Sequence, residues 1–163
     1  MAAKTRSDWK GFSLKPRKEM PEGLWTKCPV CEQMLYQKTV TENLDICPKC
    51  SHHFRIFARR RIECFADEGT FEQLASEMTS SDPLEFKYRQ TDYKSRIASA
   101  GKKASGKEAI LMGKAFVKGR AVMLGVMDFA YLGGSMGAVV GEKFCMGIEQ
   151  AIEESLPMII FAS

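Results

Sequence analysis

The 163-residue chain has no apolar run long enough to span a membrane. Its most apolar stretches, residues 121–131 and 156–162, fall well short of the ~20 residues that a transmembrane helix needs. Residues 1–18 are rich in lysine and arginine and have no apolar centre, unlike a secretory signal or a membrane anchor. We therefore expect a cytoplasmic protein that does not enter a membrane.

Histidine is scarce, and no acid–base constellation of the kind that general acid–base catalysis uses stands out in the sequence. The two histidines, His52 and His53, adjoin a cysteine pair. That position favours packing around a metal site over membership of a catalytic triad. The alternative is that one of them replaces a cysteine as a metal ligand.

Four of the six cysteines form two pairs with the spacing of metal ligands. Two residues separate Cys28 from Cys31, two separate Cys47 from Cys50, and fifteen lie between the pairs. A proline after the first cysteine of each pair fixes a tight turn. The pattern predicts one structural zinc, because four thiolate ligands leave no open position for a substrate.

Disulfides are the alternative use of these cysteines, and the reducing cytoplasm that we expect disfavours them. The two remaining cysteines, Cys64 and Cys145, lie in helical patterns outside the pairs. We expect both to be small buried hydrophobic residues.

The charge is divided unevenly along the chain. Residues 1–61 carry a net charge of +7 and residues 62–163 a net charge of −3. The basic residues near the cysteines are Lys49, Arg55, Arg59, Arg60 and Arg61. Three interpretations stay open: a site that attracts the phosphates of a ligand, a nucleic-acid surface, or a solvated charged face.

Residues 34–40 favour β-structure, and a turn at 42–43 toward Ile46 would complete a two-stranded zinc ribbon. Thr70 is expected to cap a helix, with Gln73 at the capping-box position. Three short helices are predicted along the middle of the chain, over residues 59–66, 70–77 and 91–100.

The last third of the chain is apolar and rich in β-formers. Strands are predicted over 109–117 and 121–129, with a hairpin turn at Lys118-Gly119-Arg120 between them. A glycine-rich loop over 131–137 leads into a helix, and an apolar strand begins near Met158. This order predicts a right-handed crossover onto a sheet. The helix is expected to bury a stripe spaced by four residues, made of Val140, Phe144, Ile148 and Ile152.

Two groups of residues, in this order and at this separation, resemble the β subunit of bacterial acetyl-CoA carboxylase carboxyltransferase. The first runs from Leu24-Trp25-Thr26-Lys27-Cys28 to Cys50-Ser51-His52-His53. The second is Gly133-Gly134-Ser135-Met136-Gly137 followed by Val140-Gly141-Glu142-Lys143-Phe144. The resemblance extends from about Pro21 to the last residue.

The resemblance implies an α/β fold: a four-cysteine zinc ribbon, short helices, and the first part of a crotonase-like domain built of ββα units. The expected organisation has four parts, namely an N-terminal arm over 1–23, the ribbon over 24–56, a helical connector over 57–107 and an incomplete carboxyltransferase domain over 108–163.

The activity that the resemblance implies is transfer of a carboxyl group from carboxybiotin to acetyl-CoA, giving malonyl-CoA for fatty-acid synthesis. The implied biotin is carried on a partner, the biotin carboxyl carrier protein, which works with biotin carboxylase. The implied assembly is an α2β2 heterotetramer with the carboxyltransferase α subunit.

The resemblance also implies which residues meet the substrate. Backbone N–H groups of Gly133, Gly134, Ser135 and Gly137 are expected near the acyl-CoA. The alternative is that Gly133-Gly134 only shapes a tight turn and that Gly137 only permits close helix packing. Ser135 is either a helix N-cap or a substrate donor. The Gly-Gly pair that supplies the family's oxyanion donors would follow Ser163, so we expect no catalytic residue in this chain and no activity without the rest of the subunit.

Two other functions are compatible with parts of the pattern. One is a zinc-ribbon nucleic-acid-binding module, for which the apolar segment from Ala109 onward has no use. The other is the β-type subunit of a different acyl-CoA carboxylase or decarboxylase, relatives that usually lack a four-cysteine ribbon.

Overall fold

The computed structural model describes residues 23–162, so the expected N-terminal arm lies almost wholly outside the described residues. The chain divides into two compact units, one ending at His52 and the other beginning at His53. Among the described residues, no helix is both long and apolar enough to cross a membrane.

The first unit is a small hairpin with one helix. Strand β1 (Trp25–Lys27) pairs antiparallel with β2 (Met34–Tyr36), and α1 (Gln37–Glu42) follows directly. The prediction of a strand over 34–40 that pairs toward Ile46 is therefore wrong beyond Tyr36. Residues 39–41 are all β-branched, but burial of Val40 outweighs their weak helix propensity.

The second unit is built on a four-stranded sheet with the order β3-β6-β7-β8. Its strands are β3 (Glu72–Gln73), β6 (Ile110–Val117), β7 (Arg120–Met127) and β8 (Met158–Phe161). The predicted hairpin is confirmed, since Val117 pairs with Arg120 and both turn residues have positive φ, +51° at Lys118 and +74° at Gly119. Strands β7 and β8 pair in parallel, and α4 (Ala138–Glu153) connects the end of β7 to the start of β8.

The segment predicted as a helix over 70–77 is instead an edge strand, β3, with turns around it. Thr70 does not cap a helix: its hydroxyl donates to the Asp67 carbonyl at 2.7 Å and accepts from the Phe116 N–H at 3.1 Å. The Asp67 carboxylate also accepts from the hairpin N–H groups of Lys118 and Gly119. These long-range bonds hold the segment against the sheet, which local propensity does not reveal.

Two helices and a short hairpin complete the second unit. Helix α2 (Ala58–Phe65) lies within one residue of its predicted bounds. Strands β4 (Lys87–Tyr88) and β5 (Thr91–Asp92) form a hairpin that leads into α3 (Tyr93–Lys103). Helix α3 therefore begins after Asp92, not at Thr91, and continues past Gly101.

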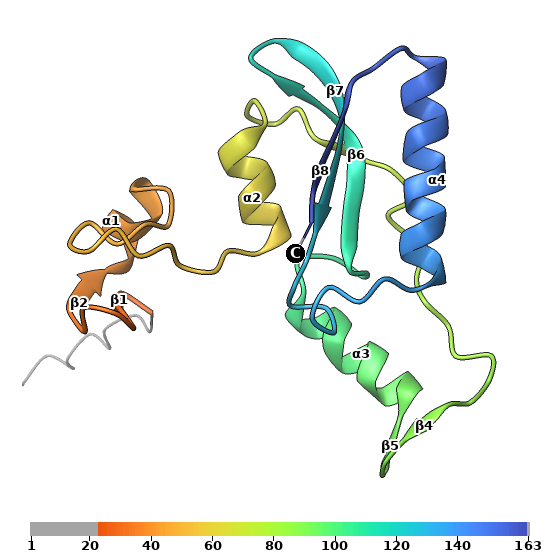
Figure 1. The fold of residues 1–163 in the computed structure, drawn as a ribbon, viewed down its shortest axis with the longest axis horizontal. Helices are drawn as coiled ribbons and strands as arrows, with labels where there is room; N and C mark the ends of the chain where they lie inside the picture. Colours follow the sequence, from red (N-terminus) through yellow and green to blue (C-terminus); the bar gives the residue numbers. More distant parts are fainter. Residues whose placement is uncertain (1–22, 163) are drawn as a thin grey trace, which may run out of the picture. The chain divides into compact units, whose positions relative to one another are not determined.

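The sheet is covered on both faces, by α4 on one side and α2 on the other (Figure 1). Alternate residues of β6 divide between the two layers, with Ile110 and Met112 on the α4 side and Leu111 and Ala115 on the α2 side. Both faces of the central strands are therefore apolar, as the sequence indicates.

Helix α4 buries only the first part of the predicted stripe, since Val140 is buried and Phe144 packs partly buried against the core. Ile148 is 45% exposed and Ile152 is 74% exposed. A spacing of four advances about 40° beyond a full turn at each step, so the stripe winds away from the sheet. The residues that α4 does bury are Val140, Lys143, Gly147 and Ala151. Small residues in the second half of α4 let the helix pack closely against the sheet. A Cβ on Gly147, for example, would lie 2.8 Å from the sulfur of Met112 in β6.

Candidate metal centre and glycine loop

The two cysteine pairs form two turns of the same design. In each, the first cysteine N–H donates across the turn, from Cys28 to the Gln33 carbonyl at 3.0 Å and from Cys47 to the His52 carbonyl at 2.8 Å. The residue after each second cysteine has positive φ, +56° at Glu32 and +60° at Ser51. The repeated geometry turns both pairs of sulfurs inward, so the two Cys-Pro-x-Cys motifs fold as equivalent knuckles.

The four sulfurs converge on one point. The Sγ atoms of Cys28, Cys31, Cys47 and Cys50 all lie within 4.8 Å of one another. Cys28 Sγ is 3.6 Å from Cys50 Sγ, and Cys31 Sγ is 3.7 Å from Cys47 Sγ. A disulfide needs about 2.0 Å, whereas tetrahedral thiolates at about 2.3 Å from zinc stand about 3.8 Å apart. The residues therefore fit a four-thiolate zinc site.

Ionisation of the cysteines also fits a divalent cation. Burial opposes ionisation of Cys28, but the backbone N–H groups of Cys31 and Val30 lower its pKa to about 7. The pKa of Cys47 is lowered in the same way, with burial opposed by N–H groups of its own turn. At Cys50 the His52 N–H favours the thiolate, but desolvation and the neighbouring sulfurs raise the pKa to about 12. Cys50 resists ionisation because its thiolate would be repelled by the neighbouring thiolates. A bound cation offsets this repulsion between negative charges.

Neither histidine belongs to the metal cluster found among the described residues, which consists of the four cysteines alone. His52 contributes its backbone carbonyl to the second knuckle. Cys64 is half-buried and Cys145 is exposed, so the expectation of burial is wrong for Cys145.

The four residues predicted to meet the substrate lie together in the loop between β7 and α4. Leu132, Gly133 and Gly134 have consecutive positive φ values of +46°, +73° and +75°, and the Gly134 N–H donates to the Tyr131 carbonyl at 2.8 Å. Ser135 does not cap α4, because the N-cap residue is Gly137. A Cβ on Gly133 or Gly137 would meet nothing within 4 Å, so open space, not helix packing, surrounds both positions.

Beneath the loop lies a group of buried polar side chains that the sequence reasoning missed. Glu108, Asp128, Tyr131 and Lys143 are each no more than 2% exposed. Glu108 accepts hydrogen bonds from the Ser80 N–H and, at 3.3 Å, from the Tyr131 hydroxyl. The sequence did contain a sign of this group. Glu108 and Asp128 stand at the ends of apolar strands and Lys143 stands within an apolar helix, where charged residues are rare.

These buried groups fix the start of the loop. Asp128 accepts from the N–H of Ser105 at 2.7 Å and from the N–H of Ala130 at 3.0 Å. Burial, with the negative charge of Glu108 adding to it, raises the pKa of Tyr131 to about 12. Burial lowers the pKa of Lys143, and Glu108 partly offsets that effect. The loop therefore starts from a hydrogen-bonded buried support.

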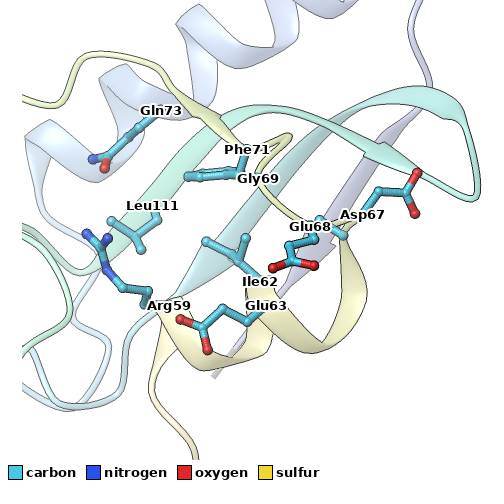
Figure 2. Close-up of a pocket in the computed structure, with 10 residues that line it drawn as sticks. Arg59, Ile62, Glu63, Asp67, Glu68, Gly69, Phe71, Gln73 and Leu111 are labelled. Carbon is cyan, nitrogen blue, oxygen red and sulfur yellow. The ribbon is translucent and has the colours of Figure 1, made fainter.

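Two cavities differ in the charge of their walls. One, of about 690 Å³, lies between α2 and the sheet and is drawn in Figure 2. Its apolar wall includes Ile62, Phe71 and Leu111, and its charged side chains are Arg59 and the acids Glu63, Asp67 and Glu68. The other, of about 360 Å³, lies between α3 and the glycine loop and includes Gly133, Arg96 and Lys103.

Three arginines of the predicted basic cluster have partners within the second unit. Arg55 lies over the Phe129 ring, 4.1 Å from its centre, and Arg61 lies 5.6 Å from the centre of the Phe161 ring. Arg60 pairs with Glu63 at 3.6 Å. Much of this charge is thus engaged in packing α2 and the loop.

Comparison with known proteins agrees with these features. The family model for the acetyl-CoA carboxylase zinc finger domain matches residues 25–50, which include all four cysteines. The acetyl-coenzyme A carboxylase carboxyl transferase subunit beta of Citrifermentans bemidjiense is 44% identical over 147 residues, 90% of this chain and 52% of that protein. The chain is thus similar to a carboxyltransferase β subunit over most of its own length, including the four-cysteine segment. It spans about half the length of this relative.

Solved structures of carboxyltransferases share the fold. Transcarboxylase 12S with methylmalonyl-coenzyme A and methylmalonic acid bound matches with a TM-score of 0.52 and 20% identity, over 67% of this chain and 19% of that chain. A single-chain, multi-domain long-chain acyl-CoA carboxylase matches with a TM-score of 0.54 and 20% identity, over 67% of this chain and 11% of that chain. The predicted fold class, a zinc ribbon followed by part of a crotonase-like domain, is confirmed.

Proposed function

We propose that the subunit of which this chain is part transfers a carboxyl group from carboxybiotin to acetyl-CoA, giving malonyl-CoA. The observation that carries the proposal is the 44% identity to a carboxyltransferase β subunit over 90% of the chain. The proposal includes the partners implied by the sequence: the α subunit in an α2β2 assembly, the biotin carboxyl carrier protein, biotin carboxylase, and a cytoplasmic location.

The zinc centre stabilises the first unit in this proposal and takes no part in the reaction. Four protein ligands close the coordination shell, so no position remains at which water or a thioester could bind. The chemistry must therefore be performed by groups outside the ribbon.

The glycine loop suits the remaining task, which is to stabilise negative charge. As the methyl carbon of acetyl-CoA loses its proton, charge develops on the thioester oxygen, and fixed N–H donors stabilise it most effectively. The loop around Gly133 has an exposed backbone on a buried hydrogen-bonded support. We propose that its N–H groups contact the acyl-CoA, and that the α subunit and the rest of the β subunit complete the site.

The test is formation of labelled malonyl-CoA by the full-length subunit assembled with its α subunit. Gly134 has φ of +75°, so Gly134→Val should displace the loop and lower turnover at least about tenfold without loss of zinc. The matched control is Gly141→Val on the exposed side of α4, where a Cβ meets nothing within 4 Å.

Absence of malonyl-CoA formation by the unaltered assembly would overturn the proposed function. Unaltered turnover in Gly134→Val would show that the loop only makes a turn. The nucleic-acid alternative gains no support from Arg55, Arg60 and Arg61, since each has an aromatic or acidic partner.

A further inference from the structure

The cavity between α3 and the glycine loop has the chemical character of an anion site. It has a volume of about 360 Å³, and its walls come from α3, from Thr91 of β5 and from the loop that follows β7. The residues that line it are Thr91, Ser95, Arg96, Ser99, Ala100, Lys103, Ala130, Leu132 and Gly133. Three hydroxyl groups and two cations thus face the same space, with no carboxylate among the lining residues.

The helix that supplies these groups is unusually basic. The sequence of α3, Tyr93 to Lys103, contains four cationic side chains and no acidic one. Two of the cations, Lys102 and Lys103, lie in the last turn, where the helix dipole also favours positive charge. Arg96 and Lys103 line the cavity beside the loop, whereas Lys94 and Lys102 line a separate cavity on the other flank of α3.

Two other cavities of the second unit are less suited to an anion. The α2 cavity in Figure 2 has three carboxylates against one guanidinium, so its walls repel phosphate. The cavity on the other flank of α3 contains Asp82, and its Lys107 is paired with Glu77 at 2.5 Å. A positive surface without a carboxylate next to the glycine loop is therefore particular to the Arg96 flank among these three cavities.

The loop side of the cavity is open at the backbone. Gly133 is exposed, has φ of +73°, and would meet nothing within 4 Å if it carried a Cβ. A ligand can therefore approach its main chain directly. A volume of about 360 Å³ is at the small end of ligand sites, enough for a phosphate-bearing portion of a cofactor but not for the whole of coenzyme A.

We propose that this cavity binds the phosphate groups of the acyl-CoA thioester. Arg96 and Lys103 supply the charged contacts, and the hydroxyls of Ser95 and Ser99 donate hydrogen bonds to phosphate oxygens. The acyl end then lies toward the glycine loop. The choice of coenzyme A as the phosphate source rests on the proposed function.

The test compares two double variants of the zinc-loaded 163-residue chain. Arg96→Gln with Lys103→Gln removes two charges from the cavity flank, and Lys94→Gln with Lys102→Gln removes two charges from the opposite flank of the same helix. Calorimetric titration with coenzyme A should show affinity at least about tenfold weaker for the first pair and less than about threefold weaker for the second. Arg96→Lys with Lys103→Arg should restore most of the binding, and circular dichroism and zinc content check the fold.

Equal weakening by the two pairs would show only long-range attraction and would overturn the site, as would unchanged affinity in the first pair. If the unaltered chain did not bind coenzyme A while the full assembly formed malonyl-CoA, the proposed anion site would be wrong and the proposed function would stand. If the assembly formed no malonyl-CoA but Arg96→Gln with Lys103→Gln still abolished binding, the anion site would stand and the proposed function would fail.

Discussion

The first unit holds its chain together around four sulfur atoms, whereas the second packs two apolar layers against a four-stranded sheet. Apart from cysteines, only Leu35 and Val40 are buried apolar residues in the described part of the first unit. Several of its larger apolar side chains, including Trp25 and Leu44, are exposed. A core of this size cannot offset the conformational entropy of the chain, so the ribbon depends on metal and the sheet does not.

The largest expected effect is loss of the folded structure of the first unit, with the second unit left folded. Cys47→Ala removes a buried ligand and leaves three thiolates, so zinc affinity should fall by orders of magnitude and residues 25–50 should lose their fixed structure. Elemental analysis measures the zinc, and amide NMR signals report on each unit separately. Signals of β6 and β7 should persist. The control is Cys145→Ala, an exposed position on α4.

Retention of one zinc per chain in Cys47→Ala, with dispersed signals for β1 and β2, would contradict metal dependence of the ribbon. Loss of the β6 and β7 signals together with those of the ribbon would contradict the independence of the two units.

A second change should disturb the sheet and leave the ribbon intact. A Cβ on Gly113 would lie 2.2 Å from the Glu72 carbonyl oxygen and 2.9 Å from the Gln73 Cα. Both are backbone atoms of β3 and cannot move aside without breaking the edge pairing. Gly113→Val should therefore lower the free energy of unfolding of the second unit by about 1–3 kcal/mol. Denaturant midpoints measure the change, with zinc content unaltered and Gly141→Val as the control.

A smaller effect concerns the buried support of the glycine loop. The pKa of Tyr131 is raised from 10.0 to about 12, mainly by burial and then by Glu108. Between these pH values the unfolded chain releases the phenol proton and the folded chain keeps it, so Tyr131 makes stability fall as pH rises. Tyr131→Phe should remove this fall, about 2 kcal/mol over the interval. Near neutral pH it should cost about 1 kcal/mol through the lost bond to Glu108.

Unfolding curves of the parent and Tyr131→Phe at several pH values give the difference directly. The parent should be the more stable protein near neutral pH, and its advantage should shrink as the pH approaches and passes 10 and should reverse before pH 12. A gap that stays constant to pH 12 would mean that Tyr131 titrates normally in the folded chain. Tyr36→Phe in the first unit serves as a control for general alkaline destabilisation.

The same contrast between the units explains which features the sequence could predict. Short spacings and a proline in each turn encode the zinc ligands, and a glycine-containing turn encodes the hairpin at Lys118, so both features could be placed from local pattern. The edge strand β3 could not, because its conformation depends on pairing with Gly113 and Lys114 of β6, far along the chain. The buried face of α4 depends on where Met112 meets Gly147, and apolarity alone pointed to Ile148 and Ile152 instead.

Candidate site residues show the same limit. The glycine loop was identifiable from its composition and its family resemblance, but its support was not. Glu108, Tyr131 and Lys143 come from three separate parts of the chain, and only the sheet and α4 bring them together. The cavity beside α3 likewise requires the loop to turn back toward Arg96.

The smallest expected effect is a gain in stability of the second unit that leaves the first unit unchanged. Gly101 lies inside α3, and a Cβ there would meet nothing within 4 Å. Gly101→Ala should therefore stabilise the second unit by about 0.5–1 kcal/mol, because alanine loses less backbone entropy than glycine in a helix. Hydrogen exchange of α3 amides should slow while exchange in residues 25–50 stays unchanged. Faster exchange in α3 would mean that Gly101 is needed for a bend or close contact, and equal slowing in the ribbon would mean that the two units unfold together.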